Sequence, residues 1–529
     1  MGAGHLTRRS LLAGTAGAVA GGLLRPRGAL ALLGGPPRPT LSAQWLGRLA
    51  PQGTTVELVH TADLVGLQWQ APARPRIWLR FRGKDGRWSS WVSAGTNGHA
   101  AEGLAESDQH TGDPIWTGGT TSVQVRSAHA LSGVRLHLVD VSGGVGAARR
   151  ARLSAPFVTA AALPLATPVL AAGPGQPPIL AREAWAQGRA VPRVAPEYGA
   201  VRMAFVHHTE NPNGYAPGEV PAMLRAIYVF HRYVNGWNDI GYNFVLDLYG
   251  RIFEARAGGI DEPVVGAHAG GYNLVSTGIA VLGSFMSVPI SAAARRALEA
   301  LLAWKLSLHG VPAEGSVTVR VNPAGASYSR FPANARVSLP RIAGHRDGDT
   351  TDCPGNVLYG ELPAIREGAR RLAPNPTQAT FALTVITPSP GAPSTPAAGG
   401  EAPPGQTPAE APGASATGEV HTLTGTLAFL DGTPVAGAPI AIQARTVSRR
   451  GEVVRERTLA QTTTDSAGQW SLPTSTLSEA HGGMWLRALC PGGAGFGAVV
   501  SEPLRVEAMS LTSPSATPQT PTPEAPPAT

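Results

Sequence analysis

The chain has little cysteine, little lysine and few aromatic residues. Cys353 and Cys490 are its only cysteines, so at most one disulfide could form within it. Lysine occurs only at Lys84 and Lys305, and the net charge of +8 therefore comes from arginine. So small a surplus of positive charge argues against nucleic acid as a main partner.

Long apolar runs are also missing after the N-terminal segment, so nothing there predicts a stable membrane span. The N-terminal segment carries a twin arginine, Arg8-Arg9, followed by a short Gly/Ala-rich apolar run. A membrane anchor is the alternative, but the run is short and diluted by glycine. The pattern predicts a cleaved twin-arginine export signal in residues 1–35, and hence an extracellular or cell-envelope protein.

A length of 529 residues with 65 glycines and 48 prolines predicts several globular domains joined by connectors. Residues 37–150 read as an all-β domain, because short runs such as RIWLRFR alternate in polarity. Their apolar residues are predicted to form a sandwich core, although Trp88, Trp91 or Trp116 could instead be exposed and contact sugar. An Ala/Pro-rich linker over 151–178 follows.

Residues 179–373 predict one α/β domain, a mixed sheet flanked by helices. Strand-like runs such as VRMAFVHH alternate there with helical patterns. One helix is expected between Ser291, as its N-cap, and Gly310, as its stop. A second is expected in VLYGELPAIREGARRL, and a third from about Pro217.

The C-terminal part of the chain returns to β character after a low-complexity segment. Residues 386–418 predict an extended Pro-rich linker. Residues 419–507 predict a small immunoglobulin-like β-sandwich, with Asp-Gly and Ala-Gly turns between alternating runs. Residues 508–529 form a Ser/Thr/Pro tail.

The stretch GHRDGDTTDCPG, residues 344–355, places one of the two cysteines among turn residues. A disulfide to Cys490 is one interpretation, and a small buried hydrophobic residue is another. A kinase catalytic loop is a third, but Asp352 stands where that pattern needs Asn. The polar surroundings of Cys353 instead favour a metal ligand.

A metal site needs further ligands, and the segment FVHHT at the end of a predicted strand offers them. Alternation along the strand separates His207 from His208. Two histidines, a thiolate and a water would make an open tetrahedral zinc site, whose chemistry hydrolyses amides. Spacing alone leaves this hypothesis open, because HHT and H-x7-C each arise by chance.

Five blocks in order resemble the peptidoglycan recognition protein family and the zinc-dependent N-acetylmuramoyl-L-alanine amidases related to it. The blocks are FVHHT, WNDIGYNFVLDLYGRIFEAR, VGAHAGGYN, TGIAVLGSF and AGHRDGDTTDCPG. The resemblance covers about residues 179–373 and implies an amidase domain. More loosely, the N-terminal β region resembles the extension of secreted actinobacterial members. Segment 311–340 is longer than in compact members.

The resemblance implies a role for particular residues. The zinc ligands would be His207, His345 and Cys353, and the retained cysteine favours catalysis over binding alone. Tyr242 would assist at the reacting carbonyl, and Thr351 would hydrogen-bond the tetrahedral intermediate. Asp347, Asp349 and Asp352 either orient the ligands or are solvated turn residues. His208, Trp237, His268 and Asn273 fall in blocks that border the family's substrate groove. His231 matches a recurrent family histidine or is a helix residue that helps cover the core. Arg256 either meets a stem-peptide carboxylate or is a solvated arginine.

The function that this resemblance implies is hydrolysis of the amide between muramic acid and the L-alanine of peptidoglycan, with Zn²⁺ as cofactor and peptidoglycan or muropeptides as partners. Three alternatives stay open. The protein could bind peptidoglycan without cutting it, or use Cys353 as the nucleophile of a cysteine hydrolase. It could also act mainly as a surface adhesin through its flanking β domains.

Overall fold

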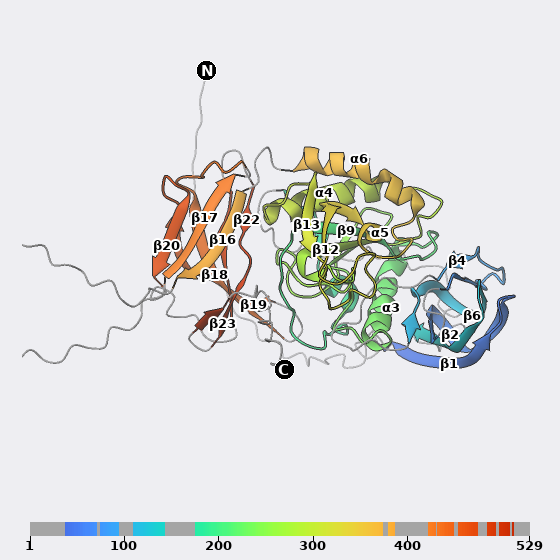
Figure 1. Cartoon of the computed structure of the whole chain (residues 1–529). Helices are drawn as coiled ribbons and strands as arrows, with labels where there is room; N and C mark the ends of the chain where they lie inside the picture. Colours follow the sequence, from blue (N-terminus) through green and yellow to red (C-terminus); the bar gives the residue numbers. More distant parts are fainter. Residues whose placement is uncertain are drawn as a thin grey trace, which may run out of the picture. The chain divides into compact units, whose positions relative to one another are not determined.

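The computed structural model contains three β-rich parts in sequence order, with helices concentrated in the central one (Figure 1). The predicted signal segment and most of both predicted linkers and of the tail lie outside the described residues. The structure describes residues 38–70, 75–94, 109–142, 175–373, 379–386, 422–429, 431–448, 453–473, 484–492, 497–507 and 510–512.

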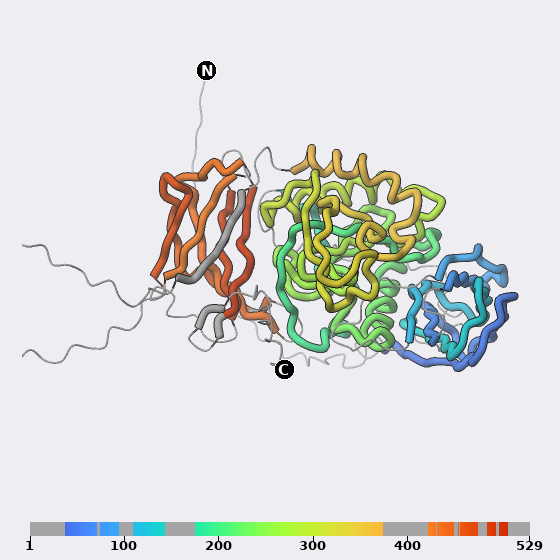
Figure 2. The backbone as a smooth tube through the Cα atoms, viewed as in Figure 1, coloured from blue at the N-terminus to red at the C-terminus, as the bar shows by residue number. Residues whose placement is uncertain are grey.

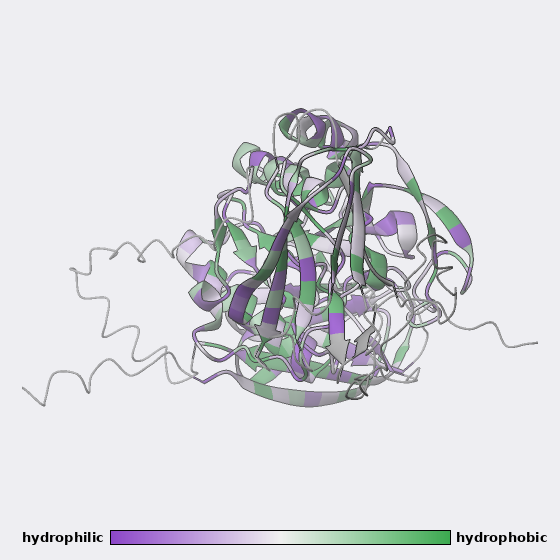
Figure 3. Ribbon diagram, turned by 90° about the vertical axis from the view of Figure 1, so that its left-hand side faces the viewer, coloured by the Kyte–Doolittle hydropathy of each residue, from purple (hydrophilic) through white to green (hydrophobic). Residues whose placement is uncertain are grey.

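Within the described residues, the strands of the N-terminal part form one hydrogen-bonded antiparallel sheet. Along β3 (Ile77–Phe81) the side chains alternate as expected, with Ile77, Leu79 and Phe81 buried. Such alternation between green and purple is visible along strands in Figure 3. The sheet order is β1-β7-β2-β6-β3-β4, with β5 on β2. Its other strands are β1 (Thr40–Leu49), β2 (Thr54–Trp69), β4 (Val92–Ser93), β5 (His110–Thr111), β6 (Ile115–Ser127) and β7 (Leu131–Asp140).

The three tryptophans that could contact sugar, Trp88, Trp91 and Trp116, differ in their surroundings. Trp116 is buried and belongs to a hydrophobic core, as packing predicts. Trp88 and Trp91 are half-buried, and the Arg80 guanidinium lies 5.3 Å and 4.7 Å from their ring centroids. Cation–π contacts with arginine therefore hold these two rings on the sheet surface.

The central part contains the predicted mixed sheet, in the order β15-β9-β12-β10-β11-β8. All its neighbouring strands are parallel except β10 and β11. Every residue of β9 and β12 is buried, as in a parallel sheet covered on both faces. The strands are β8 (Ile179–Leu180), β9 (Met203–His208), β10 (Phe244–Leu246), β11 (Ile252–Glu254), β12 (Ser276–Val281) and β15 (Ile342–Gly344).

Helices cover both faces of this sheet. Ala204 and Val206 of β9 face α4 (Ala292–Leu308) and α6 (Asn356–Leu372), which lie together in Figure 1. Alternate residues such as Ala280 of β12 face α3 (Val220–Tyr233). The expected N-cap is present, because Ser291 Oγ accepts a hydrogen bond from the Ala294 backbone N–H at 3.0 Å. The other helical elements are α2 (Glu183–Ala186), α5 (His345–Gly348), η2 (Pro217–Glu219) and η3 (Asn273–Val275).

The long segment 311–340 forms a separate two-stranded sheet of β13 (Ser316–Arg320) and β14 (Arg336–Pro340). Figure 2 follows this stretch of tube next to the strands of the central sheet. Its Val319 and Leu339 pack with Met203 and Phe205, which point to the opposite face of β9 from Ala204. The insertion thus covers the sheet face from which His207 projects.

The C-terminal part contains two sheets, one of three strands and one of six. The first includes β16 (Ala379–Ile386), which pairs with β17 although it precedes the segment predicted as a linker from composition. The strands are β17 (Thr422–Phe429) and β20 (Gln469–Pro473) in the first sheet, and β18 (Pro439–Val447), β19 (Val453–Thr463), β21 (Trp485–Cys490), β22 (Val499–Val500), β23 (Leu504–Glu507) and β24 (Ser510–Thr512) in the second.

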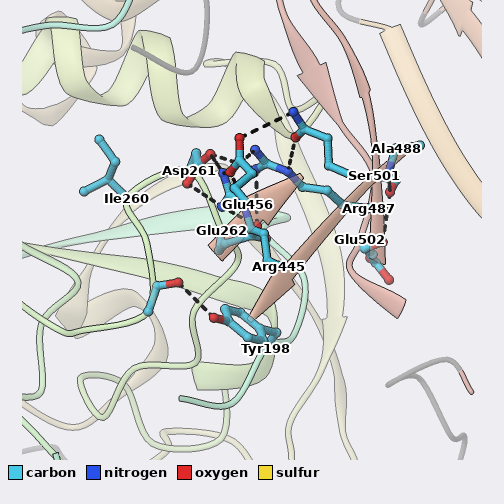
Figure 4. A network of polar contacts seen from close by, with 12 residues as sticks. Tyr198, Ile260, Asp261, Glu262, Arg445, Glu456, Arg487, Ala488, Ser501 and Glu502 are labelled. Carbon is cyan, nitrogen blue, oxygen red and sulfur yellow. Dashed lines mark hydrogen bonds and ion pairs between the residues drawn. The ribbon is translucent and has the colours of Figure 1, made fainter. Parts of the chain in front are cut away.

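A buried ion-pair network joins the second of these sheets to the loop after β11 (Figure 4). Arg445 of β18 binds both oxygens of Asp261, at 3.0 Å and 2.7 Å, and Glu262 Oε1 at 2.6 Å. Arg487 of β21 contacts Asp261 Oδ2 at 2.7 Å. The four side chains are 10% exposed or less. Because these side chains are buried, removing one of them would leave a buried charge without its partner and destabilise the contact.

The structure bears on two interpretations of the sequence, a disulfide between the two cysteines and a membrane-spanning segment. Cys353 and Cys490 are both buried free thiols, so the disulfide interpretation is wrong. Among the described residues, no helix has both the length and the apolarity that crossing a membrane requires.

Candidate metal centre

Two neighbouring parallel strands end side by side and carry the two histidines of the candidate site. In β9 and β15, Val206 pairs with Gly344, so the next residues lie side by side: His207 within β9 and His345 at the start of α5. Both imidazoles are buried, and their ring centroids are 4.4 Å apart. Carboxyl ends of adjacent parallel strands are a common location for binding sites, and here the sequence places two metal-binding side chains there.

The loop after α5 brings Cys353 to the same point. The Arg346 backbone N–H donates to the Cys353 carbonyl at 3.0 Å, which folds the loop back on α5. Cys353 Sγ then lies 3.7 Å from His207 Nδ1. One ligand atom each from His207, His345 and Cys353 lies within 4.8 Å of the others. The structure therefore brings together the three residues that the sequence suggested as ligands.

Contacts on the far side of each imidazole determine which ring nitrogens face the centre. His345 Nε2 lies 2.9 Å from Asp349 Oδ2, which also accepts the Gly270 backbone N–H at 2.7 Å. His207 Nε2 lies 3.2 Å from His268 Nδ1. These contacts leave Nδ1 of both His207 and His345 as the metal-facing atoms, an arrangement typical of metal-binding histidines.

The three aspartates of the GHRDGDTTDCPG loop have different roles. Asp349 is fully buried against His345, so it orients a candidate ligand. Asp347 caps α5, because its Oδ2 accepts the Gly344 backbone N–H at 2.9 Å. Asp352 is an exposed turn residue.

The residues present fit a zinc ion. Two imidazoles and a thiol form a donor set that zinc prefers, and three protein ligands would leave one coordination position for solvent or substrate. Burial raises the pKa of the Cys353 thiol, while a hydrogen bond from the His208 backbone N–H, at 3.4 Å, opposes that rise. A divalent cation reverses such a shift, because a coordinated thiol is deprotonated.

Tyr242 and Thr351 lie near the trio, each by a different contact. The Tyr242 ring centroid is 5.4 Å from that of His207. Burial raises the pKa of the Tyr242 hydroxyl well above its usual value, so the group stays protonated and can donate a hydrogen bond. Thr351 Oγ1 accepts the Cys353 backbone N–H at 3.2 Å and so helps to shape the ligand loop.

Three of the other candidates, His208, His231 and Trp237, are buried close to the trio. His208 Nε2 contacts Glu210 Oε1 at 2.9 Å, on the strand face opposite His207. His231 Nδ1 accepts the Gly241 backbone N–H at 3.1 Å, next to Tyr242. Trp237 stacks on His231 with ring centroids 4.4 Å apart. Both aromatic residues are buried, so they position the Tyr242 segment.

Two of the other three candidates line a neighbouring cavity of about 500 Å³. Arg256 and Asn273 line it, together with Arg193 and Glu197. Asn273 Oδ1 also accepts the backbone N–H groups of His268 and Ala269, at 2.9 Å and 3.0 Å. His268 itself is buried against His207, so it belongs to the trio's surroundings and not to the cavity wall.

Residues that the sequence did not single out also meet the site. Glu210 has a left-handed backbone, with φ +56°, and its Oε2 accepts a hydrogen bond from Ser284 Oγ at 2.9 Å. The electrostatic influence of Asp113, from the N-terminal sheet, reaches Tyr242 and Cys353. A positive φ at a non-glycine residue directly after HHT has no signature in the sequence, and neither has a contact across domains.

Two family models match parts of the chain. Residues 197–356 match the model for N-acetylmuramoyl-L-alanine amidase. Residues 38–155 match a model described as Rv3811 N-terminal galactose-binding domain-like. The first match contains all three candidate ligands, and the second covers the N-terminal sheet.

Curated relatives align with about a third of the chain. A human N-acetylmuramoyl-L-alanine amidase is 28% identical over 180 residues, which are 33% of this chain and 26% of that protein. Peptidoglycan-recognition protein LE of Drosophila melanogaster is 32% identical over 184 residues, 35% of this chain and 45% of that protein. The chain thus spans about a quarter to a half of the length of these two relatives.

Solved structures also align with about a third of the chain. Peptidoglycan recognition protein-LE in complex with tracheal cytotoxin, a monomeric diaminopimelic acid-type peptidoglycan, is 26% identical over 35% of this chain and 92% of that one, with a TM-score of 0.26. The endolysin N-acetylmuramoyl-L-alanine amidase LysCS of Clostridium intestinale is 23% identical over 36% and 95%, with a TM-score of 0.26.

Residues 197–356, which match the model for N-acetylmuramoyl-L-alanine amidase, hold His207, His345 and Cys353 together with Tyr242. An amidase and a peptidoglycan-recognition protein are among the curated relatives to which the chain is similar. The central part of the chain therefore contains a domain of the N-acetylmuramoyl-L-alanine amidase family.

Proposed function

We propose that the protein is an exported zinc-dependent N-acetylmuramoyl-L-alanine amidase that cuts the bond between muramic acid and the stem peptide of peptidoglycan. The observation that carries the proposal is the convergence of His207, His345 and Cys353 within 4.8 Å. Domain-family membership supports the reaction class. The twin arginine at Arg8-Arg9 supports export.

The chemistry divides between a metal and the residues around it. When bound, zinc would polarise the scissile carbonyl and make solvent more nucleophilic. His207, His345 and Cys353 would hold it, with Asp349 and His268 keeping the two imidazoles in place. The charge that develops on the carbonyl oxygen needs a hydrogen-bond donor.

Tyr242 is that donor in the proposal, because burial keeps its hydroxyl protonated. The Thr351 hydroxyl can donate to the same oxygen while its own oxygen accepts the Cys353 backbone N–H. A thiol nucleophile is less suitable here, since burial raises the pKa of the Cys353 thiol instead of lowering it.

The experiment that tests the function combines digestion of cell-wall sacculi, mass spectrometry of the products and metal analysis of the purified chain. We expect one zinc per chain and new L-alanine amino termini matched by free muramic acid carboxyl groups. Chelation should abolish the release of amino termini, and added zinc should restore it. Binding to sacculi without any new amino termini would mean recognition alone, and inhibition by thiol alkylation of the metal-free chain but not by chelator would mean a cysteine hydrolase.

A second prediction concerns Tyr242→Phe. Removing one hydroxyl donor should lower kcat about 100-fold with little change in KM, because the contact strengthens as charge develops on the carbonyl oxygen. Steady-state turnover of a soluble muropeptide measures both constants, and zinc content should stay at the wild-type level. Tyr249→Phe is the matched control, since its hydroxyl only donates to the Tyr215 carbonyl at 2.6 Å. Equal kcat for Tyr242→Phe and wild type would contradict the assigned role.

A further inference from the structure

The N-terminal sheet and the central domain share one hydrophobic core. Leu64, Trp116 and Val139 of the sheet pack in the same cluster as Met223 and Ile227 of α3. Gly66 lies so close to the Phe230 ring that an added Cβ would overlap it. A shared core of this kind fixes the two parts against each other, because separating them would expose buried apolar surface to water.

The docked sheet places the short loop between β5 and β6 beside the metal centre. At one end of the loop the Gly112 backbone N–H donates to the Leu67 carbonyl at 2.9 Å. At the other end the Trp116 backbone N–H donates to Asn211 Oδ1 at 2.6 Å. Asn211 is fully buried, and its Nδ2 donates to Thr209 Oγ1 at 3.0 Å. The loop is therefore anchored to the segment that directly follows the FVHH strand.

Asp113 stands in the middle of this anchored loop. Trp116, where β6 begins, packs in the same hydrophobic cluster as Tyr242, which places the loop against the candidate centre. Burial and then the Asp113 charge raise the pKa of the Tyr242 hydroxyl, in keeping with that placement. Asp113 does not belong to the trio whose ligand atoms lie within 4.8 Å of one another. Among the described residues, no hydrogen bond or ion pair to its carboxyl group is found. Burial and the Glu210 charge raise the pKa of this carboxyl, so a cationic partner is needed to favour its ionised form.

We propose that the N-terminal domain completes the active site, and that Asp113 binds the nitrogen side of the scissile amide. The inference rests on the proposed amidase function. It assigns to a second domain the partner for the leaving amine, for which the central domain has no HExxH glutamate. Glu210 is the other nearby carboxylate, but His208 and Ser284 already engage it.

The chemistry of the amide decides which side Asp113 serves. Negative charge develops on the carbonyl oxygen, so a carboxylate there would oppose the reaction, and Tyr242 already supplies a donor. The nitrogen begins as an N–H donor and leaves as an amine that becomes an ammonium group. A carboxylate accepts a hydrogen bond from the first and forms a charge-assisted one with the second. Asp113 should therefore bind the peptide product more tightly than its uncharged analogue.

The test uses the full chain and a direct binding measurement. Calorimetry compares an L-alanine-initiated stem peptide with a free amino terminus against the same peptide N-acetylated. For Asp113→Asn we expect about 10-fold weaker binding of the free-amine peptide and unchanged binding of the acetylated one. Asp113→Glu should recover part of the lost affinity. Asp85→Asn, which changes an exposed carboxylate of the same domain, is the matched control.

Turnover and metal content complete the test. Asp113→Asn should lower kcat for muropeptide about 10- to 100-fold while keeping one zinc per chain. Equal affinity for both peptides in wild type and variant, or faster turnover in the variant, would overturn the role of Asp113 alone. A wild-type chain that neither holds zinc nor releases amino termini would overturn the proposed function as well.

Discussion

Cys353→Ser should leave the purified chain almost without zinc and lower its turnover of muropeptide about 1000-fold or more. A serine hydroxyl stays protonated near neutral pH, whereas a metal ligand must be deprotonated. Serine oxygen is also a harder donor than the thiolate that zinc accepts readily. Loss of the ion removes several kcal/mol of transition-state stabilisation, which corresponds to this fall in rate.

Cys490→Ser is the matched control for this experiment. Cys490 is the other cysteine and is fully buried, but it lies in β21 of the C-terminal part. Its replacement should reduce stability while zinc content and turnover per folded chain stay at the wild-type level. Two results would count against the proposed centre. One is that Cys353→Ser retains its zinc, and the other is that the zinc-free variant turns over muropeptide at the wild-type rate.

The choice of the three candidate ligands follows from the resemblance of five sequence blocks to a known family, and local signals are consistent with it but leave it open. Strand alternation separates His207 from His208, and the parallel pairing of β9 with β15 then places His345 next to His207. The polar turn around Cys353 identified it as a ligand candidate rather than a core residue. Helix signals were equally local, as the Ser291 cap shows. These features depend on short stretches whose physical meaning does not change with the rest of the fold.

Features that depend on contacts between distant segments could not be predicted in the same way. Asp113 precedes β6 in a domain that reads as an independent β unit, so only docking on α3 reveals its position. Asp261 and Glu262 look like solvated loop acids in the sequence, yet two arginines from another sheet bury them. Similarly, β16 precedes the low-complexity segment in the sequence but pairs with β17, which follows it. Charge and alternation describe each segment, but they do not say which partner it meets.

Arg445→Met should destabilise the contact between the C-terminal sheet and the central domain by about 3–5 kcal/mol. Methionine keeps the apolar stem but removes the guanidinium that binds Asp261 through two oxygens and Glu262 through one. Arg487 alone would then face two buried carboxylates. Urea unfolding and hydrogen exchange of residues 257–266 measure the loss, because this loop carries the two acids.

Arg370→Met is the matched control, since its pair with Glu367 is about half exposed and should contribute little to stability.

The pH dependence of the stability difference tests the same contact in a second way. Burial opposes ionisation of Asp261, but Arg487 and Arg445 outweigh it and hold the pKa of that carboxyl well below its usual range. A lowered folded-state pKa contributes stability above the unfolded value of about 3.9, and the contribution is lost only as pH falls through the folded value. The difference between wild type and Arg445→Met should therefore persist from pH 7 down to about 4 and shrink only in stronger acid. A difference that vanished between pH 7 and 5 would mean that the Asp261 carboxylate is not held by these arginines.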